Sequence, residues 1–108
     1  MDKNAACEAL GLNPHKNYML FFGLVRAYKG LDWLLEAFAK VKDELTDLQL
    51  IVAGEFYEDE DKYRKQIEGN GLIDRVIVKN EFVADADLRK YFGAADLIVQ
   101  PYKTATQS

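Results

Sequence analysis

The sequence predicts an α/β protein with a Rossmann-like, doubly wound parallel sheet of about four strands and helices on both faces. Short apolar runs, each the length of one strand, alternate with stretches in which apolar residues recur every three or four positions. Glycine directly follows the first two of these runs, and no internal repeat interrupts the alternation. Such an alternation is typical of parallel sheets whose strands are joined by right-handed helical crossovers.

The chain divides into a short N-terminal segment and one domain. Residues 1–17 are expected to form a helix, over residues 3–10, and a turn-rich connector. Residues 18–108 are expected to form the partial Rossmann-like domain. Its strands are predicted at residues 18–22, 48–53, 75–79 and 97–99. Its helices are predicted at residues 31–45, 60–69 and from 85 or 87 to 92 or 93.

Apolar patterning predicts which parts of these elements are buried. The strand runs at 18–22, 48–53 and 97–99 are almost wholly apolar, which is typical of buried strands. Apolar residues from Leu31 to Leu45 form one stripe on a helix of about four turns. The tyrosines and phenylalanines fall at helix and strand spacings, so we expect core positions rather than a platform for stacking bases.

Composition and charge argue against several functional classes. A net charge of −4 does not suit a protein that coats nucleic acid. No apolar run approaches the roughly 20 residues that a membrane-spanning helix needs. A single histidine and a single cysteine argue against a structural zinc site. Because Cys7 cannot form an internal disulfide, we expect a reducing compartment and a cytoplasmic location.

The segment from Gly23 to Gly30 carries the candidate chemistry. It joins a predicted strand to a helix N-terminus and contains two cations, Arg26 and Lys29. Helix N-termini and cationic side chains both bind phosphate oxygens, so the segment predicts an anion site. On spacing alone, two solvated loop cations are an equal alternative. The middle glycine of dinucleotide-binding sites and the Gly-Lys-Ser/Thr of P-loops are both missing, which argues against oxidoreductases and triphosphatases.

The acidic residues that follow the second predicted strand do not have the spacing of a metal site. Glu55 and the run from Glu58 to Asp61 are nearly consecutive rather than spaced to converge on one ion. A solvated helix start explains them better. We therefore assign no metal ligands.

Four blocks of sequence, in order, resemble one known family. Residues 21–38 read FFGLVRAYKGLDWLLEAF, and residues 50–54 read LIVAG. The later blocks are GLIDRVIV at residues 71–78, and residues 82–102, which open with FV and close with YFGAADLIVQPY. Together they resemble the C-terminal, nucleotide-sugar donor domain of group 1 retaining glycosyltransferases, which have the GT-B architecture of two Rossmann domains. The resemblance covers nearly the whole chain from Tyr18 onward.

The resemblance implies transfer of a hexose-type sugar from a nucleotide-diphosphate donor to an acceptor, with no metal ion or other cofactor. Cations and helix N-termini would then stabilise the departing diphosphate. Lys29 falls on the lysine that precedes a glycine in the family. Arg26 takes the place of the arginine that often follows Gly23 directly, where this sequence has Leu24.

The resemblance also assigns donor-binding positions. Those within the predicted loops are Gly23, Leu24, Gly54, Phe82 and Val83. Thr106, Gln107 and Ser108 stand where the family usually has the first of two glutamates, with Thr106 at its position. The second glutamate would fall beyond Ser108.

The resemblance further implies that the chain is a fragment. The acceptor-binding N-terminal domain and the last strands of this domain would be absent, so we expect the fragment to be inactive. Its parent would bind a nucleotide-sugar donor and a sugar or glycan acceptor, but no nucleic acid, and a location peripheral to a membrane is open. If the first strand lies between the second and fourth, residues 97–99 form an uncovered edge, and we expect the fragment to self-associate.

A second class of function was also considered. A non-catalytic doubly wound interaction module of the receiver type would share the predicted fold. Such a module carries acidic residues at the end of its first strand, whereas this strand ends in Gly23 with basic residues after it.

Overall fold

The computed structural model describes residues 1–57 and 59–100. Its elements are α1 (Lys3–Leu10), β1 (Asn17–Phe22), the 3₁₀ helix η1 (Ala27–Lys29), α2 (Leu31–Val41), β2 (Leu48–Ala53), α3 (Glu60–Gly69), β3 (Val76–Lys79), α4 (Asp85–Ala94) and β4 (Leu97–Ile98). Every helix and strand predicted from the sequence is present, and the predicted order is confirmed.

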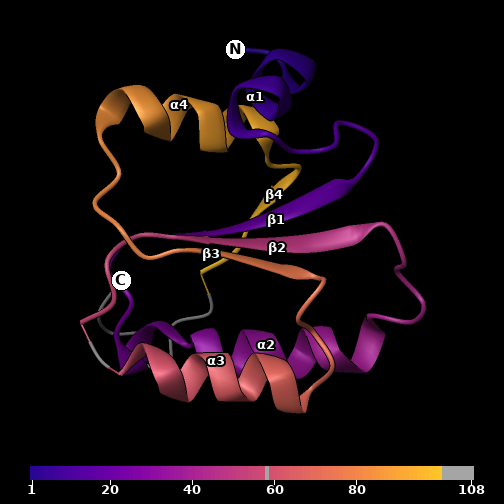
Figure 1. Cartoon of the computed structure of the whole chain (residues 1–108), viewed down its shortest axis with the longest axis vertical. Helices are drawn as coiled ribbons and strands as arrows, with labels where there is room; N and C mark the ends of the chain where they lie inside the picture. The colour runs from indigo at the N-terminus through magenta and orange to yellow at the C-terminus, as the bar shows by residue number, and fades with distance from the viewer. Residues whose placement is uncertain (58, 101–108) are drawn as a thin grey trace.

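The four strands form one parallel sheet in the order β3-β2-β1-β4. Figure 1 shows α1 and α4 on one face of this sheet and α2 and α3 on the other. The Rossmann-like, doubly wound arrangement is therefore confirmed, including the placement of β1 between β2 and β4. Because all strands are parallel, their carboxyl ends meet along one side of the sheet.

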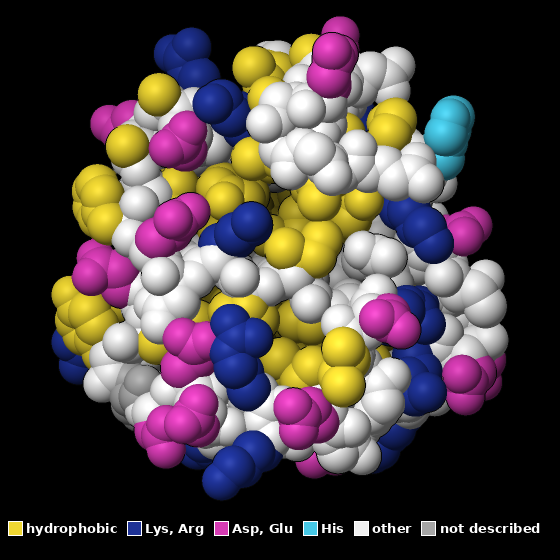
Figure 2. Space-filling view, viewed as in Figure 1, with side chains coloured by type: hydrophobic (Ala, Val, Ile, Leu, Met, Phe, Trp, Pro, Cys, Tyr) yellow, Lys and Arg dark blue, Asp and Glu magenta, His cyan; other side chains and the backbone are white. Residues whose placement is uncertain are grey.

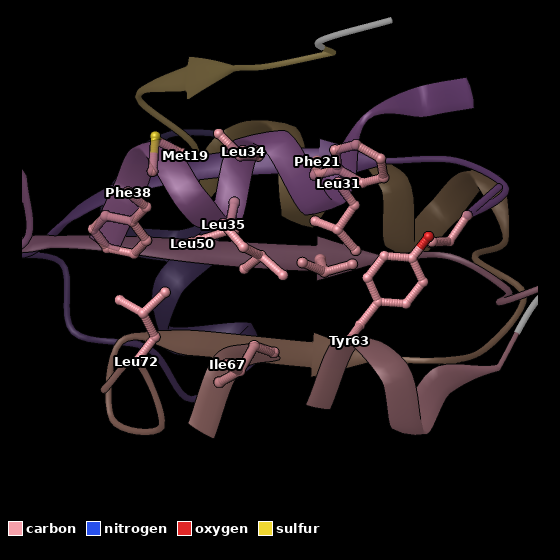
Figure 3. Close-up of a cluster of buried hydrophobic side chains, with 12 residues drawn as sticks. Met19, Phe21, Leu31, Leu34, Leu35, Phe38, Leu50, Tyr63, Ile67 and Leu72 are labelled. Atoms are coloured by element: carbon pink, nitrogen blue, oxygen red, sulfur yellow. The ribbon is translucent and has the colours of Figure 1, made fainter. Parts of the chain in front are cut away.

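Alternate residues of β1 and β2 supply the two hydrophobic cores. On one face, Met19 and Phe21 pack with residues of α2 and α3, as Figure 3 shows. On the other face, Tyr18 and Leu20 pack with Ala6 and Cys7 of α1 and with α4. Successive strand residues point to opposite faces, so a strand that is apolar throughout fills both cores. Burial of β1 and of the second half of β2 is confirmed.

Helix α1 is fastened to the sheet by close packing and by one ion pair. A Cβ on Gly93 would lie 2.9 Å from the Cβ of Ala6, so glycine allows α1 and α4 to approach. The Lys3 ammonium lies 2.8 Å from a carboxylate oxygen of Asp96, and the N–H of Tyr18 donates to the same oxygen at 2.9 Å. These contacts join α1, β1 and the segment that enters β4.

The helix predicted over residues 31–45 is shorter than expected, since α2 ends at Val41 and Leu45 is 49% exposed. Arg75 explains this end. Its guanidinium donates to the carbonyl oxygens of Lys42, Leu45 and Leu48. Carbonyls that accept from Arg75 no longer need helical partners, and the chain turns toward β2.

Two burial predictions were wrong. Leu97 and Ile98 of β4 are 56% and 51% exposed, because β4 is an edge strand. Several aromatic side chains lie at the surface instead of in the core: Tyr28, Tyr57, Phe82 and Phe92. Tyr57 and Phe82 belong to loops, where an apolar side chain has no element spacing to indicate its direction.

Candidate functional site

The carboxyl ends of β1 and β2 touch through two glycines. A Cβ on Gly54 would lie 1.8 Å from the carbonyl oxygen of Gly23, so no other residue fits at position 54 without moving β1. Both glycines also have positive φ, 118° and 146°, which side chains disfavour. Glycine at both positions therefore allows the two backbones to approach closely at the strand ends.

The loops beyond these glycines are tied to one another. The N–H of Val25 donates to the carbonyl of Glu55 at 2.8 Å, and the N–H of Tyr57 donates to the carbonyl of Val25 at 3.1 Å. The side-chain oxygen of Asn80, just after β3, accepts from the N–H of Phe56 at 3.0 Å. Three consecutive strand ends thus share one hydrogen-bonded rim.

A pocket of about 180 Å³ opens at this rim. Its lining residues are Phe22, Gly23, Leu24, Gly54, Glu55, Phe82 and Val83. Five of them were candidate donor-binding residues, so the fold brings together positions as distant in sequence as Gly23 and Val83. Phe22 and Glu55 were not assigned, although each directly adjoins a glycine that was.

Lys29 lies beside this pocket. It ends the 3₁₀ turn η1, and its ammonium is 3.4 Å from the place where a Cβ on Gly23 would lie. Gly30 follows with φ 77° and serves as the N-cap of α2, so the helix begins directly after the lysine. A cation and the positive end of a helix dipole therefore both lie near the end of β1.

Arg26 lies against an aromatic ring. Its guanidinium carbon lies 4.8 Å from the centroid of the Tyr57 ring, on the loop that follows β2. The pocket walls do not include Arg26 or Lys29. The remaining candidates, Thr106, Gln107 and Ser108, lie outside the described residues.

The acidic stretch before α3 is used by the helix itself. The Asp59 carboxylate accepts from the N–H of Asp61, which caps α3. Glu60 accepts from the side chains of Asn80 and Arg64, and these hydrogen bonds, the one from Asn80 foremost, lower the pKa of its carboxyl. Within residues 1–57 and 59–100, no group of three His, Cys, Asp or Glu side chains is arranged to hold a metal ion.

On the face drawn in Figure 2, charge is mixed rather than concentrated. Figure 2 shows Lys and Arg side chains interspersed with Asp and Glu on the face drawn, with hydrophobic side chains exposed between them. This face lacks the basic stripe that marks nucleic-acid binding. Among the helices of the described part of the chain, none has the length and apolarity to cross a membrane.

Comparison with known proteins decides the family. The model of the family described as "Glycosyl transferases group 1" matches residues 2–105. This chain belongs to that family. Membership of the group 1 glycosyltransferases decides against the receiver-type module considered above.

Two curated group 1 relatives match most of the chain. The lipopolysaccharide core biosynthesis mannosyltransferase LpsB of Rhizobium meliloti (strain 1021) is 31% identical over 106 residues, which are 94% of this chain. The D-inositol 3-phosphate glycosyltransferase of Segniliparus rotundus is 33% identical over 113 residues and covers 93% of it. The matched regions are only 29% and 23% of the two relatives' lengths, as for one part of a GT-B enzyme.

Solved structures confirm the fold of this glycosyltransferase domain. The C-terminal domain of the group 1 protein LpcC from Francisella tularensis superposes with a TM-score of 0.78 at 19% identity, covering 94% of this chain and 53% of that one. Anabaena Alr3699/HepE, in complex with UDP and glucose, superposes with a TM-score of 0.76 at 22% identity, covering 96% of this chain and 30% of that one.

Proposed function

We propose that this chain is the donor-binding part of an enzyme that transfers a hexose-type sugar from a nucleotide-diphosphate sugar to an acceptor. One observation carries the proposal. The pocket at the ends of β1 and β2 gathers five candidate donor-binding residues, and the Lys29 ammonium lies against Gly23 beside it. An apolar pocket next to a cation suits a ligand with a flat base at one end and phosphates at the other.

Each part of the site has a task in this reaction. The pocket walls from Phe22, Leu24 and Phe82 would contact the nucleoside, with Gly54 allowing close approach to the backbone. Lys29 and the N-terminus of α2 would stabilise the negative charge that develops on the diphosphate as the glycosidic bond breaks. Because the N-terminus of α2 is in place before the ligand arrives, it needs little reorganisation during the reaction.

The relatives support the same class of reaction. One relative is named as a mannosyltransferase and another as a D-inositol 3-phosphate glycosyltransferase. The structure of Alr3699/HepE holds UDP and glucose. We propose that the acceptor, a sugar or glycan, binds to parts of the enzyme beyond this chain, so the isolated chain transfers no sugar. The buried, unpaired Cys7 supports a cytoplasmic enzyme.

We also propose that the reaction needs no divalent metal, with cationic groups such as Lys29 carrying the charge stabilisation. Among the described residues, Glu55 is the one carboxylate in the pocket wall. Asp59 caps α3, and Glu60 accepts hydrogen bonds from Asn80 and Arg64. Turnover by the full-length enzyme should therefore survive a chelator. Activity that EDTA abolishes and magnesium or manganese restores would contradict this part of the proposal.

Nucleotide binding tests the central claim. Isothermal titration of the full-length protein with UDP, GDP, ADP and CDP should find at least one that binds, and the matching monophosphate should bind more weakly. Lys29→Ala should reduce this preference for diphosphate, whereas Lys40→Ala, an exposed lysine of α2, should leave it unchanged. If none of the four diphosphates binds the wild-type protein, the proposed function is wrong.

A further inference from the structure

Tyr57 belongs to the hydrogen-bonded rim at the strand ends, and its ring is held at the surface. The side chain is 51% exposed and lies on the loop between β2 and α3, so burial explains little of its placement. Its ring faces the Arg26 guanidinium, with 4.8 Å between the guanidinium carbon and the ring centroid. A guanidinium over an aromatic face at this distance is a favourable cation–π contact.

Backbone contacts fix the main chain at Tyr57 independently of Arg26. The N–H of Tyr57 donates to the carbonyl of Val25, and Val25 and Phe56 form a parallel bridge. The Phe56 ring packs edge-on against Tyr63 of α3, with the ring centroids 5.7 Å apart. The tyrosine loop is thus anchored to the loop that carries Arg26 and to the core beneath α3.

We propose that Tyr57 is a positioning residue for Arg26. Its ring provides a surface over which the otherwise exposed guanidinium is held, so fewer side-chain conformations remain to be lost when an anion binds. An arginine plane that is already restricted presents its N–H groups to phosphate oxygens at a lower entropic cost. The inference rests on the proposed function, takes the anion to be the donor diphosphate, and adds Arg26 to Lys29 as a second cation for it. Tyr57 itself need not touch the ligand.

A double-mutant cycle in the full-length protein tests this role. The proteins are the wild type, Tyr57→Leu, Arg26→Ala and the double variant, with Tyr57→Phe as the conservative variant. The measurement is the Kd of the tightest binder among UDP, GDP, ADP and CDP, and of its monophosphate. Tyr57→Leu should weaken diphosphate binding about two- to fivefold, the range expected from an exposed cation–π contact. Tyr57→Phe keeps the ring and should match the wild type.

The double variant gives the decisive result. In the Arg26→Ala background, Tyr57→Leu should cause no further loss of diphosphate affinity. The thermal unfolding midpoint of the double variant should equal that of Arg26→Ala alone. The inference would be overturned if Tyr57→Leu reduced diphosphate affinity equally in both backgrounds. It would also be overturned if Tyr57→Phe reduced the affinity as much as Tyr57→Leu does. If Lys29→Ala weakens diphosphate binding but Tyr57→Leu does not, only the inference fails. If no diphosphate binds the wild type, the proposed function fails and the inference with it.

Discussion

Lys29 is the cation that the fold brings to the end of β1, with its ammonium 3.4 Å from the Cβ position of Gly23. Lys29→Ala should lower kcat of the full-length enzyme by tenfold or more, where each tenfold corresponds to about 1.4 kcal/mol of transition-state stabilisation. The charge on the diphosphate grows as the bond to the sugar breaks, so the loss should exceed the loss in donor binding. Release of the nucleoside diphosphate measures turnover, and Lys40→Ala is the matched control. Equal kcat values for both variants would contradict the role of Lys29.

Gly23 and Gly54 show how far a sequence alone describes such a site. A glycine at the end of a buried apolar run marks a backbone turn, and the donor-binding role of both positions was predicted from the family resemblance. Their mutual contact, 1.8 Å from a Gly54 Cβ to the Gly23 oxygen, depends on the pairing of Phe22 with Ala53. Register is set by the whole sheet, so the contact could not be predicted from either segment. The same holds for Glu55, which joins the pocket wall only because this register brings it there.

Helix α1 depends on Asp96, which accepts from the Lys3 ammonium and from the Tyr18 N–H. Burial alone would raise the pKa of the Asp96 carboxyl, but the hydrogen bonds from Lys3 and Tyr18 outweigh it and lower the pKa below its ordinary value of 3.8. A lowered pKa in the folded state means that the charged form stabilises the fold. This contribution is complete above the unfolded-state pKa and is lost as pH falls through the folded-state pKa.

Asp96→Asn should therefore reduce the free energy of unfolding at pH 7 by about 1 kcal/mol, as expected for a partly exposed charged pair with one backbone hydrogen bond. The difference from wild type should begin to shrink as pH falls below the ordinary pKa of 3.8 and should be smallest below the lower folded-state pKa, where the wild-type carboxyl is protonated too. Urea unfolding of this chain at pH 7, 5 and 3 measures the difference in the free energy of unfolding between the two proteins. Asp43→Asn, at a carboxylate whose side chain is 91% exposed, is the control. A difference that stays constant with pH would show that the charge of Asp96 is unimportant.

Helix α2 was predicted to exist and to begin after Gly30, but its end was placed four residues too late. The apolar stripe gave the buried face correctly from Leu31 to Phe38. The end is decided by Arg75, which lies 27 to 33 residues from the carbonyls that it binds. Local periodicity contains no information about such a distant donor. Boundaries set by tertiary hydrogen bonds are therefore the part of an element that sequence patterns predict least well.

At the scale of the whole molecule, the order β3-β2-β1-β4 and the two helical layers followed the expectation for a doubly wound chain. The prediction that β4 is buried was wrong, because a strand is buried only where neighbouring elements cover it. Within the described residues, β4 pairs with β1 on one side and with no strand on the other. The sequence of β4 is apolar as for an interior strand, yet its position is that of an edge.

This conflict leads us to expect that the isolated chain self-associates. Leu97 and Ile98 expose more than half of their surface on an edge whose backbone groups can pair with another strand. Neither charge nor proline interrupts the run from Leu97 to Val99, so it lacks the usual protection against pairing. Burying such side chains fully contributes roughly 1.5–3 kcal/mol each, and two copies related by twofold symmetry form the simplest closed assembly.

Sedimentation velocity over a range of concentrations should show a monomer and a larger species in exchange. Ile98→Lys should shift this equilibrium to the monomer, because a lysine at an edge strand opposes pairing with a second strand. Ile73→Lys is the matched control. Ile73 is 64% exposed and lies just before β3, the strand at the opposite edge of the sheet from β4. A chain that stays monomeric at high concentration, or an Ile73→Lys variant that dissociates the assembly as fully as Ile98→Lys, would rule out association through β4.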